Sequence, residues 1–246
     1  MNHYCKNYLK HFWSRRLRRL APGSIVVVLA VTVLALAGVF TGERLRGDLL
    51  ATIGYGANWR FATEGTTYAQ LFESNASPLL HFWSLAIEEQ FYVVFPLLMA
   101  VLMRWKRLMI PTLLLLAASS SGAMILTSSR NLAYYGTHTR AAEFLIGALL
   151  ALVVPLRKEI TQRLQAFFAV GGVIALGAYV YISGTVGASD GWLYQGGLTG
   201  FTIISCLLIV AVLVPGPVRS LMSSRPLVEL GKVSYSVYLF HWPVFI

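Results

Sequence analysis

Two adjacent carboxylates, Glu88 and Glu89, lie within an otherwise apolar stretch, residues 78–96, of this 246-residue chain. A charged side chain at the centre of a membrane helix costs roughly 2.5 to 3.5 kcal/mol, so such residues face a protein interior or a wet cavity and mark functional pathways. Carboxylates placed in this way can take part in proton transfer or in an ion relay. The sequence therefore predicts a functional site around these two residues.

A polar stripe continues from these carboxylates along the predicted helix. At 100° per residue, one sector of about 80° holds four polar side chains, those of His81, Ser84, Glu88 and Tyr92. Gln90 falls on the opposite face, so other helices must surround this helix rather than lipid alone. The stripe either lines a site or only joins neighbouring helices by hydrogen bonds.

The composition identifies an integral membrane protein. Hydrophobic residues make up 57% of the chain and charged residues 12%, whereas soluble domains carry roughly 25% charged residues. The net charge of +10 reports orientation in the membrane and not a nucleic-acid partner, because the basic residues cluster beside apolar runs. With only Cys5 and Cys206 present, we expect no disulfide, no metal and no bound cofactor.

Apolar runs predict an all-α, polytopic helical bundle in the lipid bilayer. Most runs are long enough to cross a hydrocarbon core of about 30 Å. Seven spans are expected, at residues 24–41, 79–103, 108–126, 139–156, 167–182, 198–214 and 233–246.

Basic residues fix the expected orientation. Fifteen of the twenty fall on one side of the predicted spans, which the positive-inside rule assigns to the cytoplasm. Residues 1–22 then form a cytoplasmic basic segment, and residues 42–77 form an external loop whose aromatic residues suit the membrane interface. We expect a multi-pass protein of the bacterial cytoplasmic membrane with its N-terminus inside.

Two further polar features fall within predicted spans. Arg140 and Glu143 are three residues apart on one helix face, so they form either a structural ion pair or part of a substrate-contacting network. Ser234, Tyr238 and His241 share a sector of about 60° in the last span. This sector adds a second face of hydroxyl and imidazole groups.

The basic cluster at residues 15–19, RRLRR, directly precedes the first span. It serves as a topology signal that contacts anionic lipid, or it binds a phosphorylated donor, because guanidinium groups bind phosphate bidentately. The charges alone favour the first interpretation.

Four separated stretches together resemble the bacterial acyltransferase 3 family, membrane O-acyltransferases that modify lipopolysaccharide O-antigen, peptidoglycan and other extracellular glycans. The stretches are FWSRRLRRLAP at residues 12–22, HFWSLAIEEQFY at 81–92, TRAAEFLIG at 139–147 and GKVSYSVYLFHWP at 231–243. They follow the family order from one end of the chain to the other.

The resemblance implies transfer of an acyl group, often acetyl, from cytoplasmic acyl-CoA to a hydroxyl of a glycan outside the membrane. Arg16 and Arg19 match the R-x-x-R element of the family, which favours a role near the donor phosphates. We expect catalytic or cavity residues on the hallmark helix, namely Glu88, Glu89, His81 and Tyr92. The substrate cavity is expected to include Trp83, Ser84, Arg140, Glu143, Tyr238 and His241.

The chain also departs from the family pattern. Family members usually begin with a helix that bears an Arg-x10-His element, and no such helix precedes residue 12. We therefore expect residues 1–246 to be a partial acyltransferase 3 membrane domain that lacks the main catalytic histidine and is inactive alone. A further span and an SGNH-type domain are expected downstream.

A transporter is the competing functional class. In that case Glu88, Glu89 and Arg140 would form a proton or ion relay. Inverted repeats would favour it, and the sequence contains no convincing internal repeat. Dependence on acyl-CoA separates the two classes, because a transporter has no need of that donor.

Overall fold

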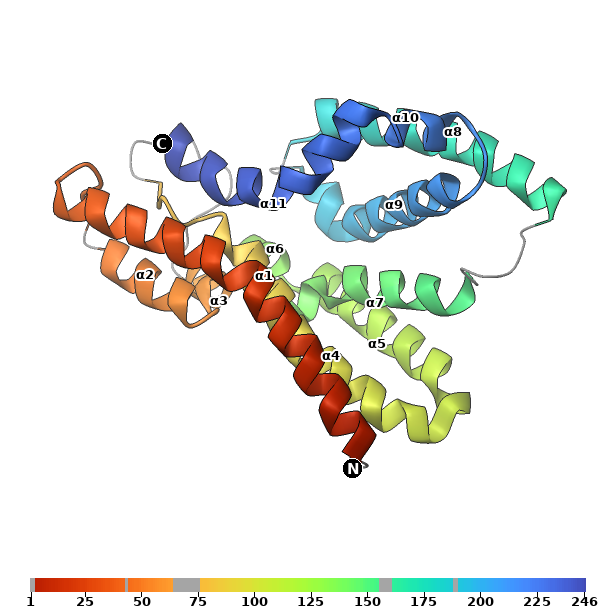
Figure 1. Ribbon diagram of the computed structural model, residues 1–246, viewed down its shortest axis with the longest axis horizontal. Coiled ribbons are helices and arrows are strands. Elements are labelled where there is room, and N and C mark those ends of the chain that lie inside the picture. Colours follow the sequence, from red (N-terminus) through yellow and green to blue (C-terminus); the bar gives the residue numbers. More distant parts are fainter. Residues whose placement is uncertain (1–2, 43, 64–75, 155–160, 188–189) are drawn as a thin grey trace. The chain divides into compact units, whose positions relative to one another are not determined.

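The structure is a computed structural model that describes residues 3–42, 44–63, 76–154, 161–187 and 190–246. Every regular element in these ranges is helical, and they contain no strand, which confirms the all-α prediction for the described part. The α-helices are α1 (His3–Leu36), α2 (Leu45–Ile53), α3 (Ala57–Thr63), α4 (Phe82–Leu102), α5 (Lys106–Leu126), α6 (Arg130–Tyr135), α7 (Thr137–Val153), α8 (Gln162–Thr185), α9 (Gly197–Leu213), α10 (Pro217–Met222) and α11 (Arg225–Phe245). Two 3-10 helices, η2 (Met103–Trp105) and η3 (Gly191–Gln195), complete the set (Figure 1).

Within the described ranges, three helical stretches are long and apolar enough to cross a membrane. They are Lys10–Leu36, Phe82–Leu126 and Gln162–Thr185. The second contains α4, η2 and α5, which the sequence predicted as two spans, and α9 is apolar but shorter. Each of the seven predicted ranges overlaps a helix. The chain is therefore a helical membrane protein. The number of spans, seven, stays a prediction.

The chain divides into two compact units. The first contains residues 1–109, 135–137 and 234–246, and the second contains residues 110–134 and 138–233. Helix α11 therefore begins in the second unit and ends in the first. The first unit holds α1 to α4, and these helices carry the polar stripe and the N-terminal arginines.

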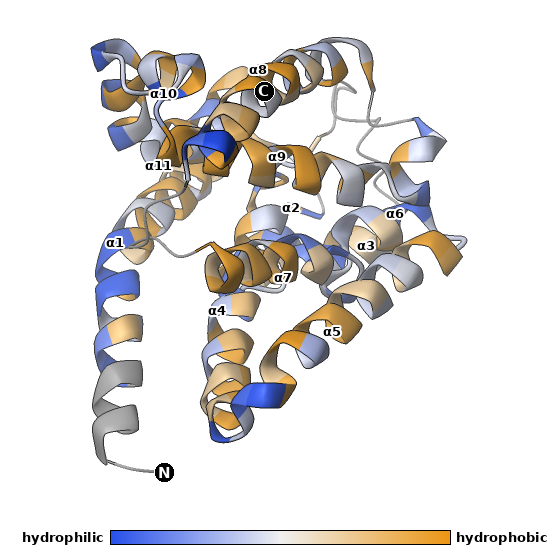
Figure 2. Cartoon of the chain, turned by 90° about the vertical axis from the view of Figure 1, so that its right-hand side faces the viewer, coloured by the Kyte–Doolittle hydropathy of each residue, from blue (hydrophilic) through white to orange (hydrophobic). Residues whose placement is uncertain are grey.

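Helix α1 joins the basic segment and the first apolar run without interruption. It includes Pro22, so the boundary expected near residue 22 is a change of composition and not the start of a helix. Figure 2 shows this change as a passage from hydrophilic to hydrophobic colouring along α1.

The C-terminal part of α11 packs against α1 near that proline. The Tyr235 hydroxyl donates to the Leu20 carbonyl at 2.7 Å and also lies 3.0 Å from the Ser24 hydroxyl oxygen. A Cβ atom on Gly23 would lie 2.8 Å from a methyl carbon of Leu239, so the missing side chain permits the close approach of the two helices. This contact fixes the last part of α11 within the first unit.

The segment 42–77 is not simply a loop, because it contains α2 and α3. Helix α3 packs on α4, where Gln90 donates to the Tyr55 carbonyl at 2.8 Å and to the Asn58 side-chain oxygen at 2.9 Å. Thr137 donates to the Gln90 side-chain oxygen at 2.5 Å, and Asn58 is fully buried. These bonds confirm that protein, and not lipid, covers the Gln90 face of α4. Residues 64–75 of the segment lie outside the described ranges.

In the second unit, small residues let helices approach closely. Helices α8 and α9 lie side by side, and a Cβ atom on Gly172 would collide with that of Ala211. Helices α5 and α7 are joined where the Ser120 hydroxyl accepts a hydrogen bond from the Ala142 backbone N–H at 2.9 Å. The second unit is thus a separate helical pack with its own buried contacts.

Candidate functional site

The polar stripe of α4 has different partners at its two ends. Glu88 and Tyr92 meet α1, whereas His81 and Ser84 meet the last part of α11. Tyr92 comes eleven positions after His81, a rise of roughly 16 Å at about 1.5 Å per residue. The stripe thus connects two groups of side chains within the first unit.

At the first end, Arg16 of α1 binds Glu88 of α4. The Arg16 Nη2 atom lies 2.8 Å from Glu88 Oε1, and the guanidinium stacks on the Tyr92 ring. The Tyr92 hydroxyl donates to the same carboxylate oxygen. A charge-assisted hydrogen bond is about twice as strong as a neutral one, so this contact fixes the Arg16 side chain.

Two aromatic residues of α1 hold Tyr92 in place. The Trp13 indole N–H donates to the Tyr92 carbonyl at 3.0 Å, and Phe12 packs edge-on against the Tyr92 ring at 6.3 Å between centroids. We call these five residues, Phe12, Trp13, Arg16, Glu88 and Tyr92, the arginine–carboxylate cluster. It joins the first and second of the four sequence stretches: α1 supplies three members and α4 supplies two.

Arg16 retains donor capacity beyond its contact with Glu88. Its Nε atom is buried and makes no hydrogen bond with a described residue. A guanidinium carries five N–H donors and can bind two anions on different edges. The cluster can therefore hold Arg16 through Nη2 while another edge of the guanidinium receives an oxyanion.

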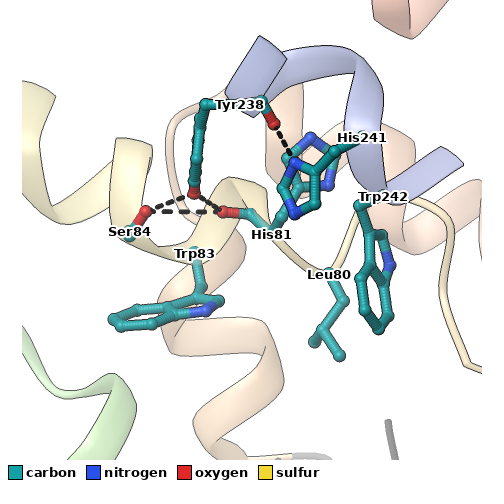
Figure 3. Close-up of a pocket in the computed structure, with 7 residues that line it drawn as sticks. All are labelled: Leu80, His81, Trp83, Ser84, Tyr238, His241 and Trp242. Atoms are coloured by element: carbon teal, nitrogen blue, oxygen red, sulfur yellow. Dashed lines mark hydrogen bonds between the residues drawn. The ribbon is translucent and has the colours of Figure 1, made fainter. Parts of the chain in front are cut away.

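At the other end of the stripe, seven residues line a pocket of about 120 Å³ (Figure 3). They are Leu80, His81, Trp83, Ser84, Tyr238, His241 and Trp242. The Tyr238 hydroxyl donates to the His81 carbonyl, the Ser84 hydroxyl donates to the same carbonyl at 3.5 Å, and the two hydroxyl oxygens lie within hydrogen-bond distance of each other. We call this group the imidazole–tyrosine pocket.

A hydrogen bond determines which nitrogen of the His241 ring carries the proton. Its Nδ1 lies 2.6 Å from the Tyr238 carbonyl oxygen, which can only accept, so Nδ1 carries the proton. In the neutral ring Nε2 is then an acceptor. The His81 and His241 ring centroids lie 5.6 Å apart.

His81 is 7% exposed, and neither ring nitrogen makes a hydrogen bond of normal geometry to a described residue. The backbone of Leu239 also interacts with the ring. A buried polar atom without a partner costs about 1–3 kcal/mol. The pocket therefore contains an imidazole with unused hydrogen-bonding capacity.

The structure does not bring every predicted residue to these two places. Arg19 is exposed and Glu89 is partly buried, and neither makes a hydrogen bond or an ion pair with a described residue. Arg140 and Glu143 form an ion pair of 3.0 Å within α7, in the second unit. Trp83 lines the pocket with its ring edge-on to Tyr135 at 5.4 Å.

Sequence reasoning missed the residues that brace the site. Trp13 and Trp242 lie in the conspicuous stretches but offer no charge or titratable group, so they were not singled out. Trp242 donates from its indole N–H to the Ser77 carbonyl at 2.9 Å and forms a wall of the pocket. The described residues include no group of three or more His, Cys, Asp or Glu side chains placed to hold a metal ion.

A family profile described as an acyltransferase domain matches residues 2–246, nearly the whole chain. The chain belongs to this acyltransferase family. Over 97% of its length it is 37% identical to the O-acetyltransferase OatA of Staphylococcus aureus, and over 96% it is 32% identical to the peptidoglycan O-acetyltransferase OatA of Listeria monocytogenes. It covers 41% and 40% of those proteins, so it spans about two fifths of the length of the relatives it matches. No solved structure matches the chain.

Proposed function

We propose that this acyltransferase domain transfers an acetyl group from cytoplasmic acyl-CoA to a hydroxyl of an extracytoplasmic glycan, with peptidoglycan as the favoured acceptor. The names of the relatives support acetyl transfer, and that of the Listeria protein specifies peptidoglycan. Lipopolysaccharide O-antigen is the less favoured acceptor, because neither relative is named for it. In this proposal the domain lies in the bacterial cytoplasmic membrane with its N-terminus inside.

The contact between Arg16 and Glu88 carries the proposal. Phosphate groups are the charged part of acyl-CoA, and a fixed guanidinium with an unused edge suits them. Arg16 precedes the apolar part of α1, on the side that the distribution of basic residues assigns to the cytoplasm. Arg19 lies one helical turn away and adds positive charge without a protein partner of its own in the described residues.

The stripe of α4 supports transfer across the membrane. From Tyr92 it extends roughly 16 Å along the helix to His81, toward the end of α4 that the orientation places outside. A donor bound at the arginine–carboxylate cluster and an acceptor near the imidazole–tyrosine pocket would then meet along one helix face. Glu88 belongs to the donor end of this face, and Glu89 is its neighbour in the chain.

Binding of acetyl-CoA tests the donor half directly. In the chain reconstituted in lipid nanodiscs, we expect Arg16→Ala to weaken acetyl-CoA binding by about 10- to 100-fold, the effect of losing a hydrogen bond to a charged group. Arg15→Ala is the matched control, because Arg15 is also on α1 but bonds to the carbonyl of His11 on its own helix. Its acetyl-CoA affinity should stay within about twofold, as is usual for an exposed charge.

Transfer of a labelled acetyl group to peptidoglycan, in membranes that carry the complete gene product, tests the acceptor half. Arg16→Ala should abolish the transfer and Arg15→Ala should preserve it. Equal acetyl-CoA affinities for the two variants would contradict the donor role of Arg16. A wild-type chain that binds no acetyl-CoA but conducts protons would support the relay by Glu88, Glu89 and Arg140 instead.

A further inference from the structure

The imidazole–tyrosine pocket has features that binding of the acyl-CoA donor does not require. Its seven lining residues include no Lys, Arg, Asp or Glu, so they offer no charge to bind the phosphates of a CoA donor. They provide two imidazoles, two hydroxyls and two indoles (Figure 3). The ligand of this pocket should therefore be neutral and should both donate and accept hydrogen bonds.

The two histidines supply complementary unused positions. His241 has its Nδ1 proton committed to the Tyr238 carbonyl, which leaves Nε2 to accept a hydrogen bond. His81 is more than nine-tenths buried, lines the pocket, and has at least one ring nitrogen without a partner among the described residues. A hydroxyl group, which donates one hydrogen bond and accepts others, matches both rings at once.

The fixed frame around the histidines favours a defined ligand over loosely held water. Tyr238 is tied to Ser84 and to the His81 carbonyl, which links the end of α11 to the start of α4. Trp242 is held by the Ser77 carbonyl, and Trp83 packs on Tyr135. Flat indole walls beside hydrogen-bonding groups suit a sugar, whose ring carries apolar C–H faces and hydroxyl edges.

The size of the pocket limits what enters. A volume of about 120 Å³ has room for several water molecules and so for a hydroxymethyl-sized group, but not for a glycan chain. The remainder of a sugar would stay outside, near the exposed edge of His241.

We infer that the imidazole–tyrosine pocket is the subsite for the acceptor hydroxyl, in which His81 and His241 hydrogen-bond one hydroxyl of the glycan and the two indoles flank its sugar ring. The identity of the glycan rests on the proposed function. The subsite itself rests on the open imidazole positions, the neutral lining and the indole walls.

Footprinting of histidines tests the inference on the wild-type chain in nanodiscs. Diethyl pyrocarbonate modifies accessible imidazoles, and mass spectrometry measures the rate at each histidine. Purified peptidoglycan glycan strands should slow the modification of His241, and of the slower-reacting His81, by about fivefold, the effect of one hydrogen bond of average strength. His11, exposed on α1, is the internal control and should react at an unchanged rate.

A matched pair of tyrosine variants tests whether protection by glycan depends on the hydroxyl in the pocket or only on the packing of α11. Tyr238→Phe removes the hydroxyl that joins Ser84 and His81, so protection by glycan should be lost while acetyl-CoA affinity is kept. Tyr235→Phe removes a hydroxyl from the same helix that bonds to α1 instead, and protection should remain. Ser84→Ala provides a milder change of the same frame and should reduce protection.

The outcomes distinguish the inference from the proposed function. Protection by glycan without Arg16-dependent acetyl-CoA binding would support the pocket and contradict the donor proposal. Protection by coenzyme A alone, or equal reaction rates with and without glycan, would overturn the inference even if acetyl-CoA binds at Arg16. Equal loss of protection in the two tyrosine variants would also overturn it.

Discussion

Among the residues that the structure describes, two arginine–glutamate pairs differ in how they are assembled. Arg140 and Glu143 are three residues apart on α7, and their side chains are 14% and 24% exposed. Arg16 and Glu88 are 72 residues apart on α1 and α4, and their side chains are 25% and 38% exposed. Both members of the first pair come from one helix, whereas the second pair exists only when two helices are packed.

The difference indicates different roles. Arg140 lies over the Tyr134 ring at 5.5 Å, and its ion pair stabilises α7 within the second unit. Arg16 is instead fixed by Glu88 and Tyr92, which belong to a different helix. We therefore propose that the α7 pair contributes to stability and that the pair joining α1 and α4 binds a ligand.

The largest expected effect on stability comes from breaking the α7 pair. Arg140→Met leaves Glu143 as an uncompensated, mostly buried charge, so we expect a loss of about 3 kcal/mol in the free energy of unfolding. Unfolding by sodium dodecyl sulfate, followed by circular dichroism in mixed micelles, measures it. Acetyl-CoA affinity of the folded protein should not change.

A double variant is the control for that prediction. Arg140→Met combined with Glu143→Leu removes both charges and should recover most of the lost stability, because no charge then remains buried. Arg163→Met, at an exposed position of α8, should change stability by less than about 0.5 kcal/mol. A large loss of acetyl-CoA affinity in Arg140→Met would assign the α7 pair to the substrate site instead.

The next effect concerns the charge of Glu88. A carboxylate about 4 Å from a phosphate repels it by about 1 kcal/mol in a water-like surrounding, so Glu88→Gln should tighten acetyl-CoA binding by about fivefold. Glu143→Gln carries the same change in the second unit and should leave acetyl-CoA affinity unchanged. Isothermal titration in nanodiscs measures both.

Whether Glu88→Gln tightens or weakens acetyl-CoA binding decides between two roles of Glu88. If the substitution weakens acetyl-CoA binding as much as Arg16→Ala does, Glu88 acts mainly by orienting the guanidinium, and repulsion is unimportant. Transfer of acetyl to glycan should fall in either case, because Glu88 holds Arg16 at the donor end of the stripe.

Helical periodicity predicted the stripe of α4 correctly, because His81, Ser84, Glu88 and Tyr92 lie on one face whatever surrounds the helix. It could not predict which partner each residue meets. Arg16 and Tyr238 come from helices 72 and 154 residues away from their partners in α4, and no local pattern encodes such pairings. The family resemblance marked both stretches as important without showing that they converge on one helix.

The polar segment 42–77 shows a different limit. Its composition suggested an external loop, but α2 and α3 form within it, and Asn58 and Tyr55 meet Gln90. Short helices stabilised by tertiary contacts carry little sequence signal, because propensity alone does not hold them. Gln90 itself gave the correct clue, since a polar side chain on that face of a membrane helix requires a protein partner.

The smallest expected effect separates the ring of Tyr92 from its hydroxyl. Tyr92→Phe removes the hydrogen bond to Glu88 but keeps the ring beneath Arg16 and beside Phe12, so acetyl-CoA affinity should fall by no more than about threefold and stability by about 1 kcal/mol. Tyr92→Leu also removes the ring and should cost a further 0.5 to 2 kcal/mol or so in acetyl-CoA binding, the range of a cation–π contact. The same titration compares the two variants. Equal losses of acetyl-CoA affinity in the two variants would mean that the Tyr92 hydroxyl positions Arg16 through Glu88. The aromatic ring would then contribute no more to binding than a leucine side chain does.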